Sequence, residues 1–409
     1  MASASITIRG VQALAPGESL WDGNHKEAVR GFGVRRQRDQ VTYVLKYRVF
    51  GRQRFFTIGP HGAPWTPEKA RREAKRLLGL VAVGKDPADA KVEAILQAAD
   101  TLRKITDQYL AVAKKKQRPR THSEVARYLL IAWKPLHSVS VFKITRRHVA
   151  ARVAEIAEQH GAVSAARART ALSTMFNWAI REGLDIPANP VLGTNRPEQP
   201  KSRERVLSDA ELAEIWRACG DDDYGRVVRL LILTAQRRDE VGGMRWAELD
   251  TAAENWTLRG DRTKNHREHV LPLVQGALAL LPPRRADRDC VFGDGPRREG
   301  DQDRGFSGWS KSRSALDARI LAARKTVDAD AQPLTHWTLH DLRRSAATAM
   351  ADRLGVLPHI VEAILNHVSG HRAGVAGVYN RARYEAEMRT ALERWSAYVS
   401  DIVKKAEAK

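Results

Sequence analysis

The stretch RLLILTAQRRDEVGGMRW, residues 229–246, predicts a pair of helices within the larger C-terminal part of the chain. Within it, Arg237 and Glu240 are three residues apart, so both side chains should lie on one helical face. In most proteins an Arg–Glu pair with this spacing is an ordinary surface salt bridge. The pair therefore gains meaning only together with residues farther along the chain.

The neighbouring residues extend this stretch to a mixed, mainly helical domain over residues 207–409. Ser208 is suited to cap the first helix of the domain. Two short strands are expected within residues 256–273, joined by a turn at Lys264. A polar, glycine-rich loop follows at 293–305, and helices resume to the end of the chain.

Upstream of this domain, four prolines within residues 187–205 indicate an interdomain linker, which we place at 197–206. Residues 91–196 predict an all-helical domain. Its helices are expected near Thr101, within residues 123–133, after Thr145, and after Ser164 with an end at Gly183.

Residues 1–90 predict a small α+β domain with a three-stranded sheet and one helix. Thr66 and Pro67 are a good N-cap and first position for that helix, which should stop near Gly84. Every second residue of one strand is apolar, as in a half-buried strand: Val41, Tyr43, Leu45, Tyr47 and Val49. The expected fold class is therefore a multidomain protein, mainly α with small β parts.

The charge of the chain favours a polyanionic partner. The formal net charge is +21 and the pI is about 10.2, which suggests nucleic acid first and an anionic membrane second. The net charge is +8 over residues 1–90 and +9 over residues 91–200, so the first half is expected to grip double-stranded DNA. No apolar stretch approaches the roughly 20 residues of a spanning helix, which argues against a membrane.

The cysteines and the N-terminus indicate a compartment. Cys219 and Cys290 are far apart in the sequence, so neither a disulfide framework nor a CxxC zinc motif is expected. The first residues lack the apolar core of a signal peptide. These features favour a cytoplasmic protein, associated with the nucleoid of a bacterial host.

Basic side chains of both N-terminal domains are candidates for contacts with DNA phosphates. For any single cluster, a solvated surface is the plain alternative. On the outer faces of the helices, Arg167 and Arg169 belong to the same basic surface. The candidate DNA contacts are Lys46, Arg48, Arg52 and Arg54 on the sheet, and Lys114, Lys115, Lys116, Arg146 and Arg147 on the helices.

Two further motifs of the C-terminal domain carry reactive side chains. The stretch LHDLRR places His340 and Arg343 one helical turn apart, so an imidazole and a guanidinium should project together. The stretch ILNH ends at His367, and Tyr379 follows it, directly before Asn-Arg.

In this order, the motifs resemble the tyrosine recombinase family, in particular the phage and genomic-island integrases. The family pattern falls on Arg237 with Glu240, Lys264, His340 with Arg343, His367, and Tyr379. Each motif alone is weak, but five in the right order are specific. The first 90 residues also resemble the arm-type DNA-binding domain of the genomic-island branch, so the resemblance covers nearly the whole chain.

The resemblance implies a site-specific integrase. It would cleave and rejoin DNA strands through a 3′-phosphotyrosyl intermediate on Tyr379, and so integrate or excise a mobile element. The physical chemistry agrees, because the paired N–H donors of Arg237 and Arg343 match the charged oxygens of a phosphorane. A phosphotyrosine also retains the energy of the phosphodiester for religation.

The remaining side chains have roles in the same scheme. His340 could take the phenol proton or hold a phosphate oxygen, Lys264 could protonate the leaving 5′-oxygen, and His367 could bond the phosphate. Glu240 is expected to buttress Arg237 rather than to act directly. The arginines supply the positive charge that a metal ion would bring, so no metal and no other cofactor is expected.

Some residues depart from this scheme or compete with it. Ala235 stands where the family has glycine, and a methyl group should be tolerated there inside the start of a helix. Tyr384 is a rival nucleophile to Tyr379. A core position is the plain alternative for Tyr379.

Histidines near the motifs have ordinary alternatives. His336 and His340 have a spacing that can bind zinc, but no HExxH motif and no cysteine partner accompany them. His266 and His269 flank the turn beside Lys264 and are expected on the surface.

Two strand exchanges require four tyrosines, so a homotetramer on two duplexes is expected, bound at core and arm attachment sites. Accessory DNA-bending or directionality proteins are candidate partners. A type IB topoisomerase resembles the same catalytic set but would not need the arm-like domain. A DNA-binding regulator without catalysis would not need the complete set, and a metal-dependent nuclease would need a carboxylate cluster that the sequence lacks.

Overall fold

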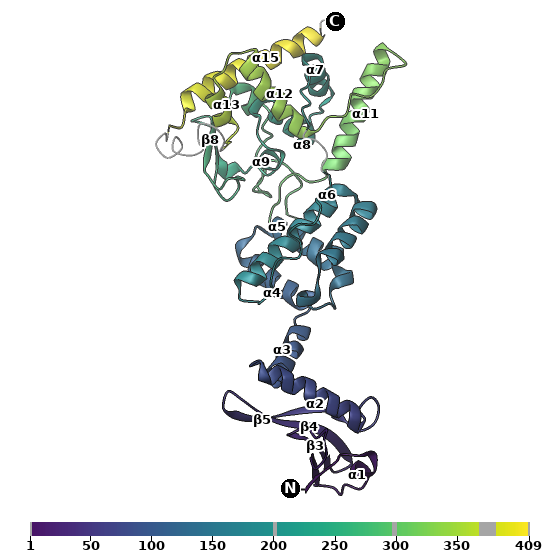
Figure 1. Cartoon of the computed structure of the whole chain (residues 1–409). Coiled ribbons are helices and arrows are strands. Elements are labelled where there is room, and N and C mark those ends of the chain that lie inside the picture. The colour runs from purple at the N-terminus through teal and green to yellow at the C-terminus, as the bar shows by residue number, and fades with distance from the viewer. Residues whose placement is uncertain (1, 199–202, 297–300, 368–381, 408–409) are drawn as a thin grey trace. The chain divides into compact units, whose positions relative to one another are not determined.

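The computed structural model describes residues 2–198, 203–296, 301–367 and 382–407. The chain divides into two compact units, residues 1–201 and 202–409. The first unit holds two separate clusters of buried apolar side chains and the second unit holds one. As expected, the architecture is mainly helical with small β parts (Figure 1).

A five-stranded sheet opens the first unit. Its strands, in spatial order, are β1 (Ala2–Ala4), β2 (Ser19–Asp22), β3 (Phe32–Gln37), β4 (Gln40–Val49) and β5 (Arg52–Pro60). β1 and β2 are parallel, and the other neighbours are antiparallel. β3, β4 and β5 are the three strands expected from the sequence, whereas β1 and β2 are too short to show an alternating pattern.

A short helix, α1 (Ile8–Gln12), precedes β2, and a longer one, α2 (Pro67–Ala82), packs on β4 and β5. The predicted start of α2 is confirmed, because the Thr66 side chain accepts a hydrogen bond from the Lys69 backbone N at 3.3 Å. Ala74 and Leu77 of α2 join the apolar side of β4 in one buried cluster. The N-terminal sheet thus has its own hydrophobic core.

The rest of the first unit is helical. Its elements are α3 (Pro87–Ala99), α4 (Leu102–Lys116), α5 (Pro119–Arg127), the short turns η1 (Tyr128–Ala132), η2 (Lys134–Leu136) and η3 (Val141–Lys143), and α6 (Arg146–Arg181). Thr101 and Thr145 cap α4 and α6 as expected. α6 breaks at Gly161, three residues before the expected start at Ser164, because φ 81° and ψ 160° are open only to glycine.

The second unit combines eight described helices with a small antiparallel sheet. The helices are α7 (Asp209–Ala218), α8 (Asp223–Thr234), α9 (Arg238–Gly242), α10 (Gln275–Leu278), α11 (Trp309–Val327), α12 (Leu339–Asp352), α13 (Pro358–Ile364) and α15 (Glu385–Glu407). The sheet consists of β6 (Leu249–Asp250), β7 (Asn255–Leu258) and β8 (His269–Pro272), with the turn η4 (Trp246–Glu248) before it.

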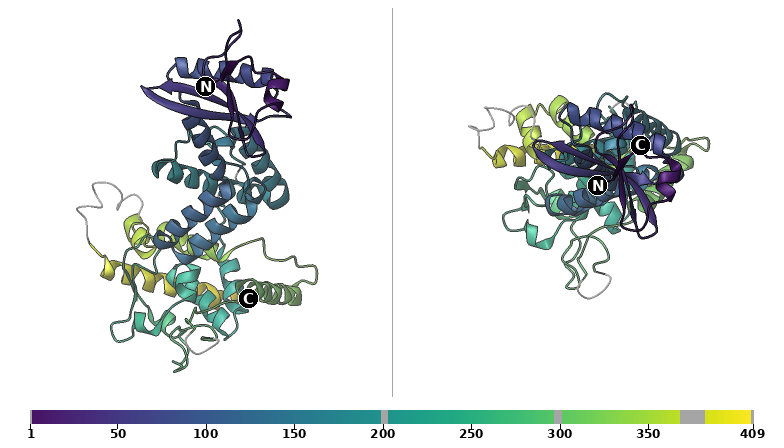
Figure 2. Two further views of the ribbon diagram at one scale, coloured as in Figure 1. Left: turned by 90° about the horizontal axis from the view of Figure 1, so that it is seen from below. Right: turned by 60° about the horizontal axis from the view of Figure 1, so that its bottom comes forward.

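Within the second unit, α8 is the central helix, and α15 packs against it and several other elements. α8 is buried along most of its length and packs against α10, α12 and α15. α15 also contacts α7, α13 and β8 (Figures 1 and 2). Trp395 of α15 is fully buried and donates its indole N–H to the Ile232 carbonyl of α8 at 2.8 Å. These contacts bring the ends of α8, α12 and α13 together.

Candidate active site

Arg237 lies at the junction between α8 and α9 and is the N-cap of α9. α8 ends at Ala235, whose φ of 54° and ψ of 23° place it in the left-handed region. The expectation that Ala235 lies inside the start of a helix is therefore wrong: it terminates a helix, at a position that favours glycine. Both the backbone N and the guanidinium of Arg237 donate to the carboxylate of Glu240, at 3.1 and 2.9 Å.

Arg343 is held by backbone carbonyls from two other elements. The start of α12 is fixed by Asp341, which accepts hydrogen bonds from the Thr338 backbone N at 2.8 Å and its hydroxyl at 3.0 Å. Arg343, only 3% exposed, donates through Nη1 to the Ala235 carbonyl at 2.7 Å and through Nη2 to the Leu365 carbonyl. The guanidinium thereby joins α8, α12 and α13, and part of its five N–H donors remains for a ligand.

The two arginines form a concentrated positive field. Burial, and then the charge of Arg237, lowers the pKa of Arg343 to about 10. Partial desolvation followed by the charge of Arg343 lowers the pKa of both His340 and His367. Like charges in a desolvated site favour an anionic ligand, and the neutral imidazoles can accept or donate one hydrogen bond each.

Lys264 lies in the loop between β7 and β8, and its side chain is exposed. The loop is anchored beside it by Arg262, whose guanidinium pairs with Glu248 and donates to the Glu240 carbonyl at 3.0 Å. Thr263, fully buried, donates its hydroxyl to carbonyls within the loop. The predicted tight turn is therefore an ordered loop tied to the same segment as Arg237.

His367 follows the last turn of α13. Its backbone N donates to the Glu362 carbonyl at 3.1 Å, and its Nδ1 lies 3.7 Å from a Glu362 carboxylate oxygen. His269, expected on the surface, is instead 6% exposed, and its Nε2 lies 3.2 Å from the Ile364 carbonyl of α13. Burial is the main cause that lowers the pKa of His269 to about 4, so the ring is neutral and donates to this carbonyl.

The predicted nucleophile Tyr379 lies outside the described residues. The rival Tyr384 is half-buried directly before α15, with its ring centroid 5.1 Å from that of His359. The described part thus brings together Arg237, Glu240 and Arg343, with His340 and His367 in their electrostatic field.

Sequence reasoning missed the polar residues that hold these groups. Gln236 is 1% exposed and donates through Nε2 to the Ile364 carbonyl at 2.8 Å. Asn265 donates through Nδ2 to the carbonyl and the side-chain oxygen of Asn366, at 3.0 and 2.8 Å. Their only signal in the sequence is that each is next to a motif residue, because the partners lie more than 100 positions away.

Comparison with known proteins matches both ends of the chain to family models. Residues 205–385 match the phage integrase family, and residues 6–94 match an arm DNA-binding domain. The second unit of this chain thus carries a phage integrase family domain. The protein is a site-specific tyrosine recombinase with an N-terminal arm DNA-binding domain.

Relatives of this recombinase include two prophage integrases of Escherichia coli (strain K12). IntA is 25% identical over 83% of this chain and 79% of its own length, and IntZ is 26% identical over 83% and 82%. A crystal structure of a lambda integrase tetramer bound to a Holliday junction shares the fold, with a TM-score of 0.52 and 18% identity over 83% of this chain and 94% of that one.

The recombinase exposes most of the basic side chains predicted to contact DNA. Arg48 and Arg52 on the sheet are exposed, as are Lys114, Lys115, Lys116, Arg146 and Arg147 on the helices. Lys46 is half-buried, with its ammonium 5.9 Å from the Phe55 ring centroid. The guanidinium of Arg54 pairs with the carboxylates of Asp86 and Asp89 at 2.7 Å each.

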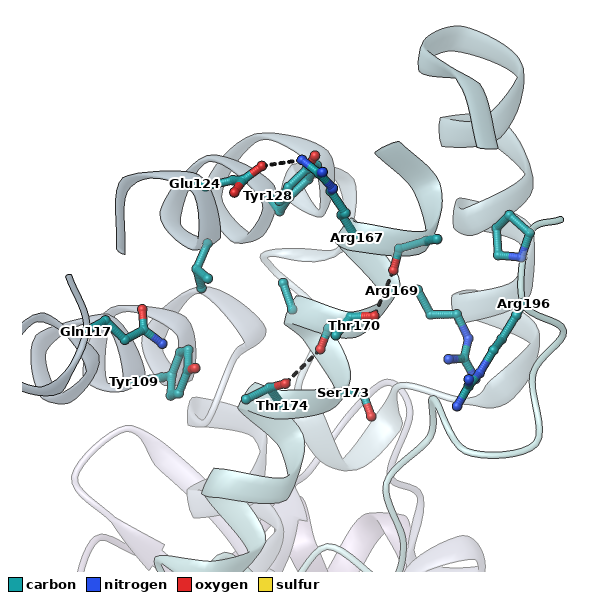
Figure 3. A pocket seen from close by; sticks show the side chains of 14 residues that line it. Tyr109, Gln117, Glu124, Tyr128, Arg167, Arg169, Thr170, Ser173, Thr174 and Arg196 are labelled. Carbon is teal, nitrogen blue, oxygen red and sulfur yellow. Dashed lines mark hydrogen bonds and ion pairs between the residues drawn. The ribbon is translucent and has the colours of Figure 1, made fainter. Parts of the chain in front are cut away.

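Arg169 differs from the expected outer basic surface. It is 9% exposed and donates to the Thr194 hydroxyl at 3.0 Å and the Val191 carbonyl at 2.9 Å, which ties α6 to the segment before the linker. Burial, and then the charge of Arg196, lowers the pKa of Arg169. Figure 3 shows the two guanidiniums close together in a cavity lined by α4, α5 and α6.

Two features are absent from the described residues of the integrase. In that part of the chain, no helix has the length and apolar character needed to cross a membrane. The same residues contain no group of three or more His, Cys, Asp or Glu side chains placed to hold a metal ion.

Proposed function

We propose that Tyr379 attacks a DNA phosphodiester and that the recombinase carries the DNA as a 3′-phosphotyrosyl ester until religation. The observation that carries this proposal is the meeting of Arg237 and Arg343 at the ends of α8, α12 and α13. Two guanidiniums in a desolvated site are suited to the extra negative charge of a phosphorane. Glu240 orients the first, and two backbone carbonyls orient the second.

The proton transfers are assigned to neighbouring side chains. His340 accepts the phenol proton or bonds a phosphate oxygen, and its lowered pKa favours the neutral form that can accept. Lys264 gives its proton to the 5′-oxygen as the phosphorus–oxygen bond to it breaks. His367 donates a bond to a non-bridging oxygen.

We further propose a division of labour along the chain. Residues 1–90 bind arm sites, residues 91–196 grip the core site, residues 197–206 form the linker, and residues 207–409 carry the chemistry. Arg146 and Arg147 support the second role, because cations at a helix N-terminus oppose the helix dipole and so indicate an anionic ligand. Lys114, Lys115 and Lys116 end α4, where the dipole alone would favour them.

At the level of the assembly, we propose a homotetramer on two duplexes, which integrates or excises a mobile element in the bacterial nucleoid. Accessory bending or directionality proteins would assist at the arm sites. Four tyrosines are needed for two strand exchanges, and the lambda integrase relative is a tetramer on a Holliday junction. A topoisomerase would act without partner exchange and has no use for an arm domain such as that matched at residues 6–94.

The nucleophile is tested with a core-site duplex nicked near the cut, which traps the covalent adduct on a denaturing gel. Tyr379→Phe should bind this DNA normally and form no adduct, because only the phenolic oxygen is removed. Tyr384→Phe is the matched control and should form adduct at the wild-type rate. An adduct from Tyr379→Phe but none from Tyr384→Phe would reverse the assignment, and binding without any adduct by the wild type would favour a regulator.

A further inference from the structure

The C-terminal end of α13 accepts hydrogen bonds from three other parts of the second unit, residues 202–409, which is called the catalytic unit below. The last carbonyls of a helix lack intrahelical partners. Here the Ile364 carbonyl accepts from Gln236 and His269, the Leu365 carbonyl from Arg343, and the Asn366 carbonyl from Asn265. These three consecutive carbonyls, at residues 364–366, are called the α13 acceptor end below.

Three of these four donors stand at or beside a residue of the proposed mechanism. Gln236 precedes Arg237, Asn265 follows Lys264, and Arg343 binds directly. The acceptor end itself leads into His367. One short segment therefore sets the positions of four functional side chains that are far apart in the sequence.

The contact of Asn265 is the most specific of these. Its Nδ2 donates to both the carbonyl and the Oδ1 of Asn366, and its own Oδ1 accepts from the Arg267 backbone N at 3.2 Å. The bond from Arg267 fixes which end of the amide faces Asn366. Asn366 is 4% exposed with φ 47°, a left-handed conformation that turns its carbonyl and side chain toward the same donor.

Lys264 depends on this contact for its position. Its exposed side chain has no hydrogen-bond or ion-pair partner in the part of the chain that the structure describes. Thr263 anchors the backbone on one side of Lys264, through bonds that stay inside the loop. On the other side, Asn265 makes the bonds that join the loop directly to α13.

We propose that Asn265 is a positioning residue that holds Lys264 against the α13 acceptor end, so that the ammonium can reach the leaving 5′-oxygen. This inference rests on the proposed role of Lys264. In the step concerned, the tyrosine oxygen forms its bond to phosphorus and releases its proton to a base. The bond from phosphorus to the 5′-oxygen breaks, and that oxygen takes a proton from Lys264. A general acid acts only within hydrogen-bond reach of its target.

The test compares two nicked core-site duplexes, one with the normal 5′-oxygen and one with sulfur in its place at the scissile phosphate. Sulfur leaves as a thiolate and needs no proton, because thiols are far more acidic than alcohols. On the oxygen substrate, Lys264→Ala should form adduct about a hundredfold or more slowly, and Asn265→Ala about tenfold or more slowly. On the sulfur substrate, both variants should return to within about threefold of wild type.

Two further variants make the result specific. Asn265→Asp keeps the shape and the bond from Arg267 but lacks the N–H donor, so it should behave like Asn265→Ala. Asn255→Ala is the matched control, because Asn255 is a half-buried asparagine of the same unit that bonds Arg389 instead. It should leave both rates unchanged.

The outcomes separate the inference from the proposed function. If sulfur rescues Lys264→Ala but not Asn265→Ala, or if Asn265→Ala is as fast as wild type, the positioning role is refuted. If sulfur fails to rescue Lys264→Ala, the acid role itself is wrong. The double variant Lys264→Ala with Asn265→Ala then tests whether Asn265 acts through Lys264. A double variant no slower than Lys264→Ala supports action through Lys264, whereas multiplied losses overturn it.

Discussion

Ala235 is one of the residues whose Cβ disfavours the backbone conformation observed. Its φ of 54° is left-handed, it is fully buried, and its carbonyl accepts a hydrogen bond from Arg343. A residue with a Cβ costs about 1–2 kcal/mol in this region relative to glycine. The contacts of α8 and Arg343 therefore maintain a strained turn beside the proposed phosphate site.

Ala235→Gly should raise the stability of the catalytic unit by about 1 kcal/mol, because it removes the Cβ from a left-handed residue. Ala397→Gly, at an exposed position inside α15, should lower it by roughly 0.5–1 kcal/mol. The thermal unfolding midpoint of each variant measures the change. A lower midpoint for Ala235→Gly would show that no strain is relieved there.

His269 links the stability of the catalytic unit to pH. Its pKa is lowered to about 4 by burial, whereas an unfolded histidine titrates near 6.5. Between these values the unfolded chain binds a proton that the folded chain does not. The contribution of neutral His269 is therefore complete above about pH 6.5 and is lost as the pH falls toward 4.

Acidification from pH 7 to pH 4 should destabilise the catalytic unit through His269 by roughly 3 kcal/mol. His269→Gln keeps a donor for the Ile364 carbonyl and removes the titration, so its unfolding midpoint should fall less steeply with acid. His336→Gln, at an exposed histidine of the same unit, is the control and should follow wild type. Equal slopes for wild type and His269→Gln would contradict the assignment.

At the scale of secondary structure, helix starts agree with prediction because they are encoded locally. Thr66, Thr101, Thr145 and Ser208 each accept a hydrogen bond from a backbone N–H three residues later. α3 begins at Pro87 behind its N-cap Asp86, where a proline could equally have marked the end of the preceding helix. Proline is compatible with both roles, and packing decides between them.

Gly161 shows how one residue divides an element. No atom lies within 4 Å of the position of an added Cβ, so only the backbone opposes substitution there. Gly161→Ala should destabilise the first unit by about 1–3 kcal/mol. Gly79→Ala, in the helical and equally open interior of α2, should instead stabilise by roughly 0.5–1 kcal/mol. Chemical denaturation measures both, and changes of the same sign would refute the backbone argument.

For the molecule as a whole, α3 connects two separately folded cores of the first unit. At its start, Asp86 accepts from the Tyr47 hydroxyl and pairs with Arg54 of the sheet. At its end, the Gln97 carbonyl accepts from the Ser140 hydroxyl at 2.5 Å. Arg54 therefore has a structural role beside its predicted contact with DNA, whereas Arg48 and Arg52 are exposed.

Removal of residues 1–90 should leave cleavage of a nicked core site intact and abolish recombination between sites that need their arms. The buried apolar cluster of the sheet is separate from the cluster of the helical part and from that of the second unit. Its removal should therefore leave the other two clusters folded. Recombination and cleavage assays on the element's attachment DNA measure the two activities. Full recombination by the truncated enzyme would show that the first domain is not needed to bind arm sites.

A full-length control keeps the domain and removes two charges. Arg48→Gln with Arg52→Gln should weaken arm-site binding and reduce its salt dependence. With fewer phosphate contacts, fewer counterions are released from the DNA on binding. Core cleavage should stay at the wild-type rate. Loss of core cleavage in this variant would point to misfolding instead.

The identity of the reactive residues and the class of the fold can be inferred from local patterns. Arg237, His340, Arg343 and His367 stand in short motifs, and helix caps and strand alternation depend on neighbours within a few positions. Such features survive in a single sequence because the physical interactions behind them are short-range. They suffice to predict a mainly helical protein, and the resemblance of the motifs to the tyrosine recombinase family adds most of the proposed catalytic set.

The support of that set could not be inferred in this way. Asn265 meets Asn366 across 101 positions, and Gln236 meets Ile364 across 128. His269 was expected at the surface and is buried against the same helix end. Polar residues that cap carbonyls of a distant helix obey no sequence period, because the folding of the entire catalytic core around α8 brings donor and acceptor together.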